Sequence, residues 1–233
     1  MASVFNAFKL LFLLTSLSFF DLGSCGEPQK SLNILPPTCT RIECPKFDSV
    51  EVGNGYEIRR YSTALWMSTS PIQDISLVAA TRTGFLQLFD YIQGKNDYNK
   101  TIEMTAPVIT EVVPSDGPFC KSSFTVSFFV PEANQADPPP AEGLHAQKWN
   151  LTYAAVRQFS GFVTDSNVGE EAAALQASIS GTKWASAIEK SHGNNSTYST
   201  SVYTVAQYNS PFESDNRVNE IWLLFQIKDE NIL

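Results

Sequence analysis

The sequence is poor in the residue types from which most enzymes build a reactive centre. Its 233 residues include two histidines, His145 and His192, four cysteines and three methionines. No H-E-x-x-H pair, G-x-S-x-G elbow, Walker loop or C-x-x-C pair is present, and Gly53–Gly55 lacks the third glycine of a dinucleotide-binding fingerprint. We therefore expect a protein that is not an enzyme.

Basic residues are also scarce. Sixteen Lys and Arg stand against 24 Asp and Glu, which gives a net charge of −8. Proteins that bind nucleic acid need clustered positive charge to neutralise phosphates, so we expect no nucleic-acid partner. Hydrophobic residues make up 43% of the chain and aromatic residues 12%, enough for a substantial core. The sequence leaves the oligomeric state open.

The one long apolar run, Leu10–Phe20, lies near the N-terminus and is followed by small residues up to Cys25. Its length fits a secretory signal peptide and falls short of the roughly 20 residues that span a membrane. We expect residues 1–25 to be a signal peptide and the mature protein to be soluble, and either secreted or vacuolar. The alternative is an uncleaved anchor.

Glycosylation motifs agree with export. N-x-S/T triplets occur at Asn99, Asn150, Asn194 and Asn195, of which the first lies in a predicted turn and the last two in a polar loop. Each triplet alone is weak support, because such triplets also arise by chance.

The cysteines predict one disulfide. Loss of Cys25 leaves Cys39, Cys44 and Cys120, enough for one disulfide and one free thiol in an oxidising compartment. The sequence does not decide the pairing, although a bond to Cys120 would join the N-terminal segment to the rest of the fold. Cys39 and Cys44 lack the second ligand pair of a zinc site, so we expect no metal there.

We expect residues 26–49 to form an extended lead-in and residues 50–233 to form a folded domain, which contains a first helix. Asp74 can serve as its N-cap, and the helix should run to about Gln93 and stop at Gly94. Thr101–Thr105 alternates with the period of a half-buried strand that ends near Pro107.

The pattern then repeats. Ile58–Ser62 resembles Val156–Ser160, and each segment is followed by a helix and two strands, the last being Phe124–Val130 and Ile221–Ile227. The second helix should cover about Val168–Ser180, with Asn167 and Glu170 at capping-box spacing and Gly181 at its end. Two strand–helix–strand–strand halves this short should pack their sheets into one core.

Six ordered motifs across residues 53–228 are similar to the SOUL haem-binding protein family. They are Gly55-Tyr56-Glu57-Ile58-Arg59, Thr83-Gly84-Phe85, Tyr91-Ile92-Gln93-Gly94-Lys95-Asn96, Met104-Thr105-Ala106-Pro107-Val108, Tyr208-Asn209-Ser210-Pro211 and Asn219-Glu220-Ile221-Trp222-Leu223. The resemblance implies an α+β fold, a distorted antiparallel β-barrel with two helices and pseudo-twofold symmetry. It also implies that haem or a related tetrapyrrole binds in a groove beside the first helix.

The first helix carries an apolar stripe with a cation inside it. Ile75, Val78, Phe85, Phe89 and Ile92 share one face at 100° per residue, and Arg82 falls among them. A tetrapyrrole needs apolar burial for its ring and a cation for its propionates, so we expect Arg82, Phe85, Phe89 and Ile92 to bind the ligand. The alternative is that the phenylalanines are ordinary core and that Arg82 forms a structural ion pair.

Iron ligation is not predicted. Some relatives have histidine at the position of Arg60, and arginine cannot ligate iron. His145, His192, Met67, Met104 and the tyrosines remain alternative ligands, although no motif places any of them. Haem would then be held by packing and by propionate contacts. The competing hypothesis is a secreted interaction module of the same fold that has lost tetrapyrrole binding. A third, a tetrapyrrole-modifying enzyme, lacks any catalytic group that we can name.

Overall fold

A computed structural model describes residues 35–115, 120–192 and 202–227. The predicted signal peptide, Cys25 and the triplets at Asn194 and Asn195 lie outside these ranges. No described helix is long and apolar enough to cross a membrane.

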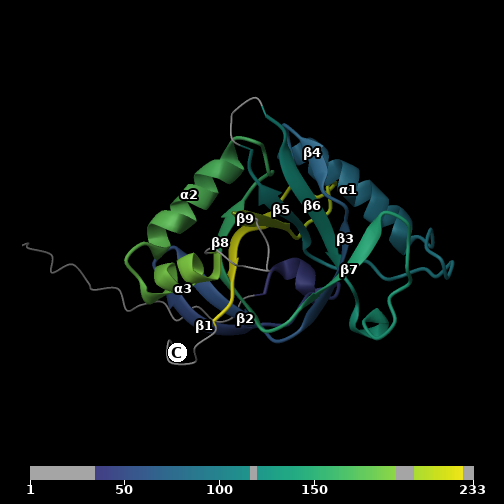
Figure 1. Cartoon of the computed structure of the whole chain (residues 1–233), viewed down its shortest axis with the longest axis horizontal. Coiled ribbons are helices and arrows are strands. Elements are labelled where there is room, and N and C mark those ends of the chain that lie inside the picture. The colour runs from purple at the N-terminus through teal and green to yellow at the C-terminus, as the bar shows by residue number, and fades with distance from the viewer. Residues whose placement is uncertain (1–34, 116–119, 193–201, 228–233) are drawn as a thin grey trace, which may run out of the picture. The chain divides into compact units, whose positions relative to one another are not determined.

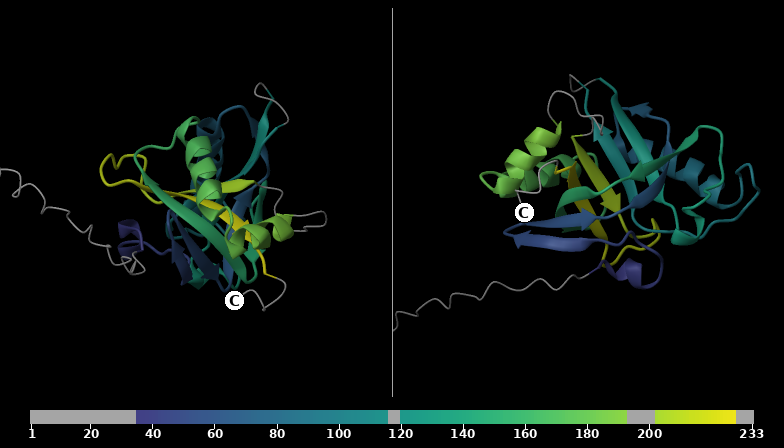
Figure 2. Two further views of the ribbon diagram at one scale, coloured as in Figure 1. Left: turned by 90° about the vertical axis from the view of Figure 1, so that its left-hand side faces the viewer. Right: turned by 60° about the horizontal axis from the view of Figure 1, so that its bottom comes forward.

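Ten antiparallel strands form one sheet, which curls around an interior with helices on its outer side (Figure 1). The views in Figure 2 show α2 and α3 together on one side of it. The strands are β1 (Asp48–Gly53), β2 (Tyr56–Tyr61), β3 (Ala64–Thr69), β4 (Ile72–Asp74), β5 (Val108–Val113), β6 (Ser122–Phe129), β7 (Leu144–Trp149), β8 (Thr152–Ser160), β9 (Tyr203–Gln207) and β10 (Val218–Phe225). The helices are α1 (Leu77–Ile92), α2 (Asn167–Ile179) and α3 (Lys183–His192), and short 3-10 turns are η1 (Pro37–Thr40) and η2 (Glu132–Asn134).

The strand order is symmetric about its centre. It runs β1-β2-β8-β10-β9-β5-β6-β3-β7, with β4 paired to β6. Outward from the central β9–β5 pair, β10, β8 and β2 on one side correspond to β6, β3 and β7 on the other. Each half therefore has the order strand–strand–helix–strand–strand: β2-β3-α1-β5-β6 in the first half and β7-β8-α2-β9-β10 in the second. The first strand of each half pairs with a strand of the other half, β2 with β8 and β7 with β3. The α+β barrel class is confirmed, with one more strand per repeat than the sequence predicted.

The predicted sequence repeat matched two strands that are not structural counterparts. Ile58–Ser62 lies mainly in β2 and Val156–Ser160 in β8, and these two strands pair directly, with Ile58 opposite Ala155. The structural counterpart of β8 is β3.

Side chains alternate between the two sides of the sheet, as the strand period requires. In β10, Ile221 and Leu223 belong to the cluster beneath α2 and α3, whereas Trp222 joins an interior cluster with Tyr61 and Trp149. A third cluster, which includes Leu88, lies beneath α1.

A buried ion pair crosses the interior. Both terminal nitrogens of Arg59 lie 2.9 Å from the carboxylate oxygens of Glu220, and Glu57 accepts from Arg59 Nε at 2.8 Å. The Tyr208 hydroxyl (2.9 Å) and Trp222 Nε1 (2.7 Å) also donate to Glu220. Since buried charges are costly unless paired and hydrogen-bonded, this network fixes β2 against β10.

The lead-in is not simply extended. It contains η1, and a disulfide joins Cys39 to Cys44. Both cysteines pack against the interior cluster, and the Glu43 carbonyl accepts from Ala106 N at 3.0 Å. One disulfide is thus confirmed, while Cys120 is a free, exposed thiol.

Other boundaries also differ from prediction. Ser76, not Asp74, caps α1, because its Oγ accepts from Ala79 N at 3.1 Å. Thr101–Thr105 forms no strand apart from one bridge at Thr105, and the strand follows Pro107 instead. Gly94 follows α1 at φ 102°, as expected of a left-handed helix end.

The second helical region was only partly predicted. Ser166 is the N-cap residue of α2 and makes no side-chain capping bond. Asn167 forms no capping box, because its amide oxygen accepts from Thr164 N instead. Gly181 follows α2 at φ 76°, and the chain then forms α3, a helix that the sequence did not predict.

Candidate functional site

Helix α1 is apolar on two nearly opposite faces. Leu77, Ala80 and Leu88 are at most 4% exposed and form the face packed on the sheet. The predicted stripe points largely away from it. Its outward members are exposed to 72% at Ile75, 43% at Val78 and 40% at Phe89, with Leu86 beside them at 54%. These exposed apolar side chains make the outer face of α1 a candidate binding surface.

The four predicted ligand contacts are distributed unequally over α1. Arg82 is exposed and forms no hydrogen bond or ion pair within the described part of the chain. Phe85 is half-buried and stacks on Phe89, with ring centroids 5.8 Å apart. Ile92 is 4% exposed and packs into the core beneath the helix. The structure therefore places Arg82 and Phe89 on the outer surface of α1 and buries Ile92. Phe85 lies between surface and core, because its ring also packs edge-on against Phe128, with centroids 5.4 Å apart.

A groove of about 720 Å³ runs along one flank of this surface, between α1 and the loop that joins β8 to α2. We call it the α1 groove; its lining residues are Ser76, Val78, Ala79, Arg82, Thr83, Leu86, Val163, Thr164 and Asp165. Arg82 lines the groove, whereas Phe85 and Phe89 do not.

Asp165 fixes the far wall of the groove to the helix. Its Oδ2 accepts from Ser76 Oγ at 2.7 Å, and its Oδ1 accepts from Val78 N at 3.1 Å. A carboxylate suits this position because the first turn of a helix leaves N–H groups without intrahelical partners. Asp165 lies 87 positions from Val78 in sequence, and no local pattern indicated that Val163 or Asp165 would meet α1.

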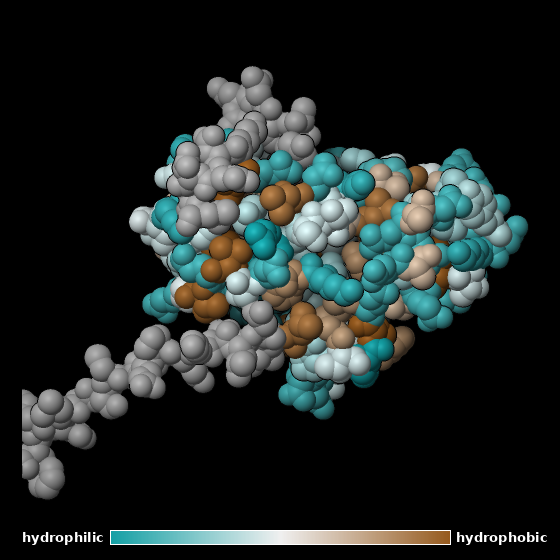
Figure 3. Space-filling model, turned by 90° about the horizontal axis from the view of Figure 1, so that it is seen from below, coloured by the Kyte–Doolittle hydropathy of each residue, from teal (hydrophilic) through white to brown (hydrophobic). Residues whose placement is uncertain are grey.

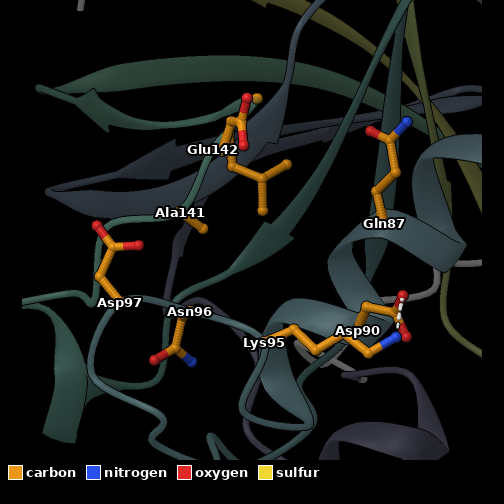
Figure 4. A pocket seen from close by; sticks show the side chains of 9 residues that line it. Gln87, Asp90, Lys95, Asn96, Asp97, Ala141 and Glu142 are labelled. Atoms are coloured by element: carbon orange, nitrogen blue, oxygen red, sulfur yellow. Dashed lines mark hydrogen bonds and ion pairs between the residues drawn. The ribbon is translucent and has the colours of Figure 1, made fainter.

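A second groove, of about 520 Å³, lies near the C-terminal end of α1 (Figure 4). It is lined by Gln87, Asp90, Lys95, Asn96, Asp97, Ala141, Glu142, Gly143 and Leu144. Its lysine is engaged, because Lys95 Nζ lies 2.8 Å from Asp90 Oδ2. The remaining charges, Asp97 and Glu142, are negative, so this groove does not suit an apolar anion.

The described residues that line the α1 groove include no histidine, cysteine, methionine or tyrosine that could ligate iron. His145 lies on β7 opposite Ser68, and His192 in α3 places Nε2 2.7 Å from the Leu224 carbonyl oxygen. Arg60 is paired with Asp48 at 2.8 Å. Over the described residues, no three His, Cys, Asp or Glu side chains are grouped to hold a metal ion.

Figure 3 shows the described apolar side chains on one face of the molecule. There, apolar side chains form small patches separated by hydrophilic residues. Phe212, 95% exposed, lies in the loop between β9 and β10.

Known proteins match this chain over the residues that form the barrel. The family profile described as SOUL heme-binding protein matches residues 42–224. Heme-binding protein 2 of Homo sapiens is 38% identical over 172 residues, which cover 72% of this chain and 77% of the human protein. The Mus musculus protein of that name is 35% identical over 206 residues, covering 85% and 94%. Heme-binding protein 1 of Xenopus laevis is 25% identical over 174 residues, covering 74% and 84%.

Among solved structures, the C-terminal domain of EcmrR gives a TM-score of 0.47 at 8% identity, over 76% of this chain and all of that domain. That similarity is too low to inform function. The profile match extends from just before β1 into β10 and so takes in both halves of the barrel. On this match and the identity to the human protein, the chain belongs to the SOUL heme-binding protein family.

Proposed function

We propose that this protein binds haem or a related tetrapyrrole, without chemically changing it, on the outer surface of α1. The observation that carries the proposal is Arg82, which is exposed, has no ion-pair partner among the described residues and lies among exposed apolar side chains of that helix. Family membership supports the ligand class, because the related proteins are named as heme-binding proteins.

The chemistry of the surface matches the two parts of such a ligand. The flat macrocycle can cover Val78, Leu86 and Phe89, which now face water, and burying them is favourable by roughly 25 cal/mol per Å². A propionate can pair with Arg82, whose guanidinium offers parallel donors to a carboxylate. Because Arg82 forms no ion pair with another described residue, it can bind the propionate without breaking an existing contact. The groove volume, about 720 Å³, lies in the range of ordinary ligand sites.

The same residues supply nothing to coordinate iron. With no histidine, methionine, cysteine or tyrosine lining the groove, we expect protein contacts to hold the porphyrin ring and its carboxylates and leave the metal unligated. Metal-free porphyrins should then bind nearly as well as haem.

Titration with haemin tests this site. Soret absorbance and tryptophan quenching report binding, and Arg82→Ala should weaken it by about 1–3 kcal/mol through loss of the charged contact. Lys46→Ala is a matched control, because that lysine side chain is 88% exposed and lies in the lead-in, outside the α1 groove.

Equal affinity of Arg82→Ala and the unchanged protein would contradict the proposed site. Failure of the unchanged protein to bind haemin or protoporphyrin would favour the alternative, an interaction module of the same fold.

A further inference from the structure

We propose that Asp165 limits the number of carboxylates that a ligand of the α1 groove can carry. This inference rests on the proposed function. It assigns the groove to tetrapyrroles with two carboxylates and predicts discrimination against those with four or more.

The groove contains two opposite charges that do not neutralise each other. Arg82 and Asp165 both line it, yet no ion pair joins them. Asp165 cannot readily swing toward Arg82, because Ser76 Oγ and Val78 N hold its two oxygens. The cation is therefore free to meet a ligand while the carboxylate stays at the opposite wall.

Among the residues that the structure describes, no other charged side chain lines the α1 groove. Its remaining polar side chains are the hydroxyls of Ser76, Thr83 and Thr164. One or two ligand carboxylates can share the Arg82 guanidinium, which presents several donors. Additional carboxylates on the ring edge would have no second described cation to pair with in the groove, and they would lie near the negative charge of Asp165.

The expected effect is moderate because the groove is open to water. Two like charges a few ångströms apart in this setting change affinity by about threefold to tenfold at low salt, and salt screens the effect beyond about 10 Å at 0.1 M. The chain's net charge of −8 acts in the same direction but does not depend on one residue.

A thermodynamic cycle isolates the charge of Asp165. Protoporphyrin IX has two carboxylates and coproporphyrin III has four, and both can be titrated at low ionic strength by tryptophan quenching. Asp165→Asn keeps an amide oxygen that can accept from Val78 N while it removes the charge. We expect it to improve coproporphyrin affinity about threefold to tenfold relative to protoporphyrin.

Two controls separate this effect from others. Asp97→Asn and Glu142→Gln each change the net charge as Asp165→Asn does, but both residues line the second groove. Both should leave the ratio of the two affinities unchanged. Thermal melting verifies folding, and Asp165→Ser, with a hydroxyl acceptor, replaces Asp165→Asn if that variant does not fold.

An unchanged affinity ratio in the charge-removing variant would overturn the role of Asp165, as would an equal shift in Asp97→Asn. In either case tetrapyrrole binding itself would still be observed. If neither porphyrin bound the unchanged protein, the proposed function would fail, and this inference with it.

Discussion

Three buried tyrosines determine how the fold responds to alkali. Burial raises the pKa of Tyr91 to about 12, and its hydroxyl donates to the Pro139 carbonyl at 3.0 Å. Burial also raises the pKa values of Tyr61 and Tyr208, and Glu220 adds to both shifts. The folded state therefore keeps all three phenols protonated at a pH where an unfolded chain would ionise them.

Because the pKa values of these tyrosines are higher in the folded state than in the unfolded state, alkali lowers the free energy of unfolding. Stability from these groups is complete below about pH 10, where unfolded tyrosine is neutral, and is lost as pH rises toward the folded pKa values. Urea unfolding at pH 8, 10 and 11.5 should show constant stability and then a fall. Tyr91→Phe should make the fall shallower, and equal stability at all three pH values would contradict the prediction.

Single residues show what the sequence could and could not reveal. Gly94 was predictable because only glycine adopts its backbone angles cheaply. The partners of Arg59 were not, because Glu220 lies 161 positions away and nothing local links them. The contact of Asp165 with Ser76 and Val78 was not predicted either, because these residues lie 89 and 87 positions away in sequence.

At the scale of elements, Gly84 decides which face of α1 meets the sheet. A Cβ at this position would lie 2.5 Å from Val126 Cβ, too close for any side chain without movement. Periodicity predicted the apolar stripe but not its direction, because α1 is apolar on two sides. The close contact of Gly84 with β6 turns the other face inward.

Gly84→Ala should therefore destabilise the protein although alanine favours helices. Overpacking costs about 1–3 kcal/mol against a propensity gain of at most about 1 kcal/mol, so we expect a net loss of about 1–2 kcal/mol in urea unfolding. Gly169→Ala in α2 is the matched control, because a Cβ there meets nothing within 4 Å, and it should be neutral or stabilising. A stabilised Gly84→Ala would show that α1 does not pack as described.

At the scale of the whole molecule, the family motifs predicted the barrel and its pseudo-symmetry, whereas the internal repeat pointed to the wrong pair of strands. Ile58 faces the helices and Val156 faces the interior, so their matched sequences do not occupy matched environments. Strand β2 pairs with β8 of the second half, and β7 pairs with β3 of the first half. Both pairings join residues that are far apart in the chain. Local patterns carry no information about such pairing.

Export is a further prediction for the whole chain. The Leu10–Phe20 run predicts cleavage near Cys25, and the exposed Asn99 offers an accessible glycosylation site. N-terminal sequencing and endoglycosidase treatment of native protein should show a new N-terminus and a loss of mass. An intact Met1 and an unchanged mass would contradict export.

The central claim, that a tetrapyrrole binds the outer surface of α1 without a protein ligand to iron, also makes a quantitative prediction for the unchanged protein. Haemin and metal-free protoporphyrin should bind with affinities within about tenfold, or about 1.4 kcal/mol, because no axial bond favours the iron form. Arg82→Ala should weaken both equally, and His145→Ala and His192→Ala should leave the Soret band unchanged. Loss of haemin binding in either histidine variant, with protoporphyrin still bound, would contradict the account.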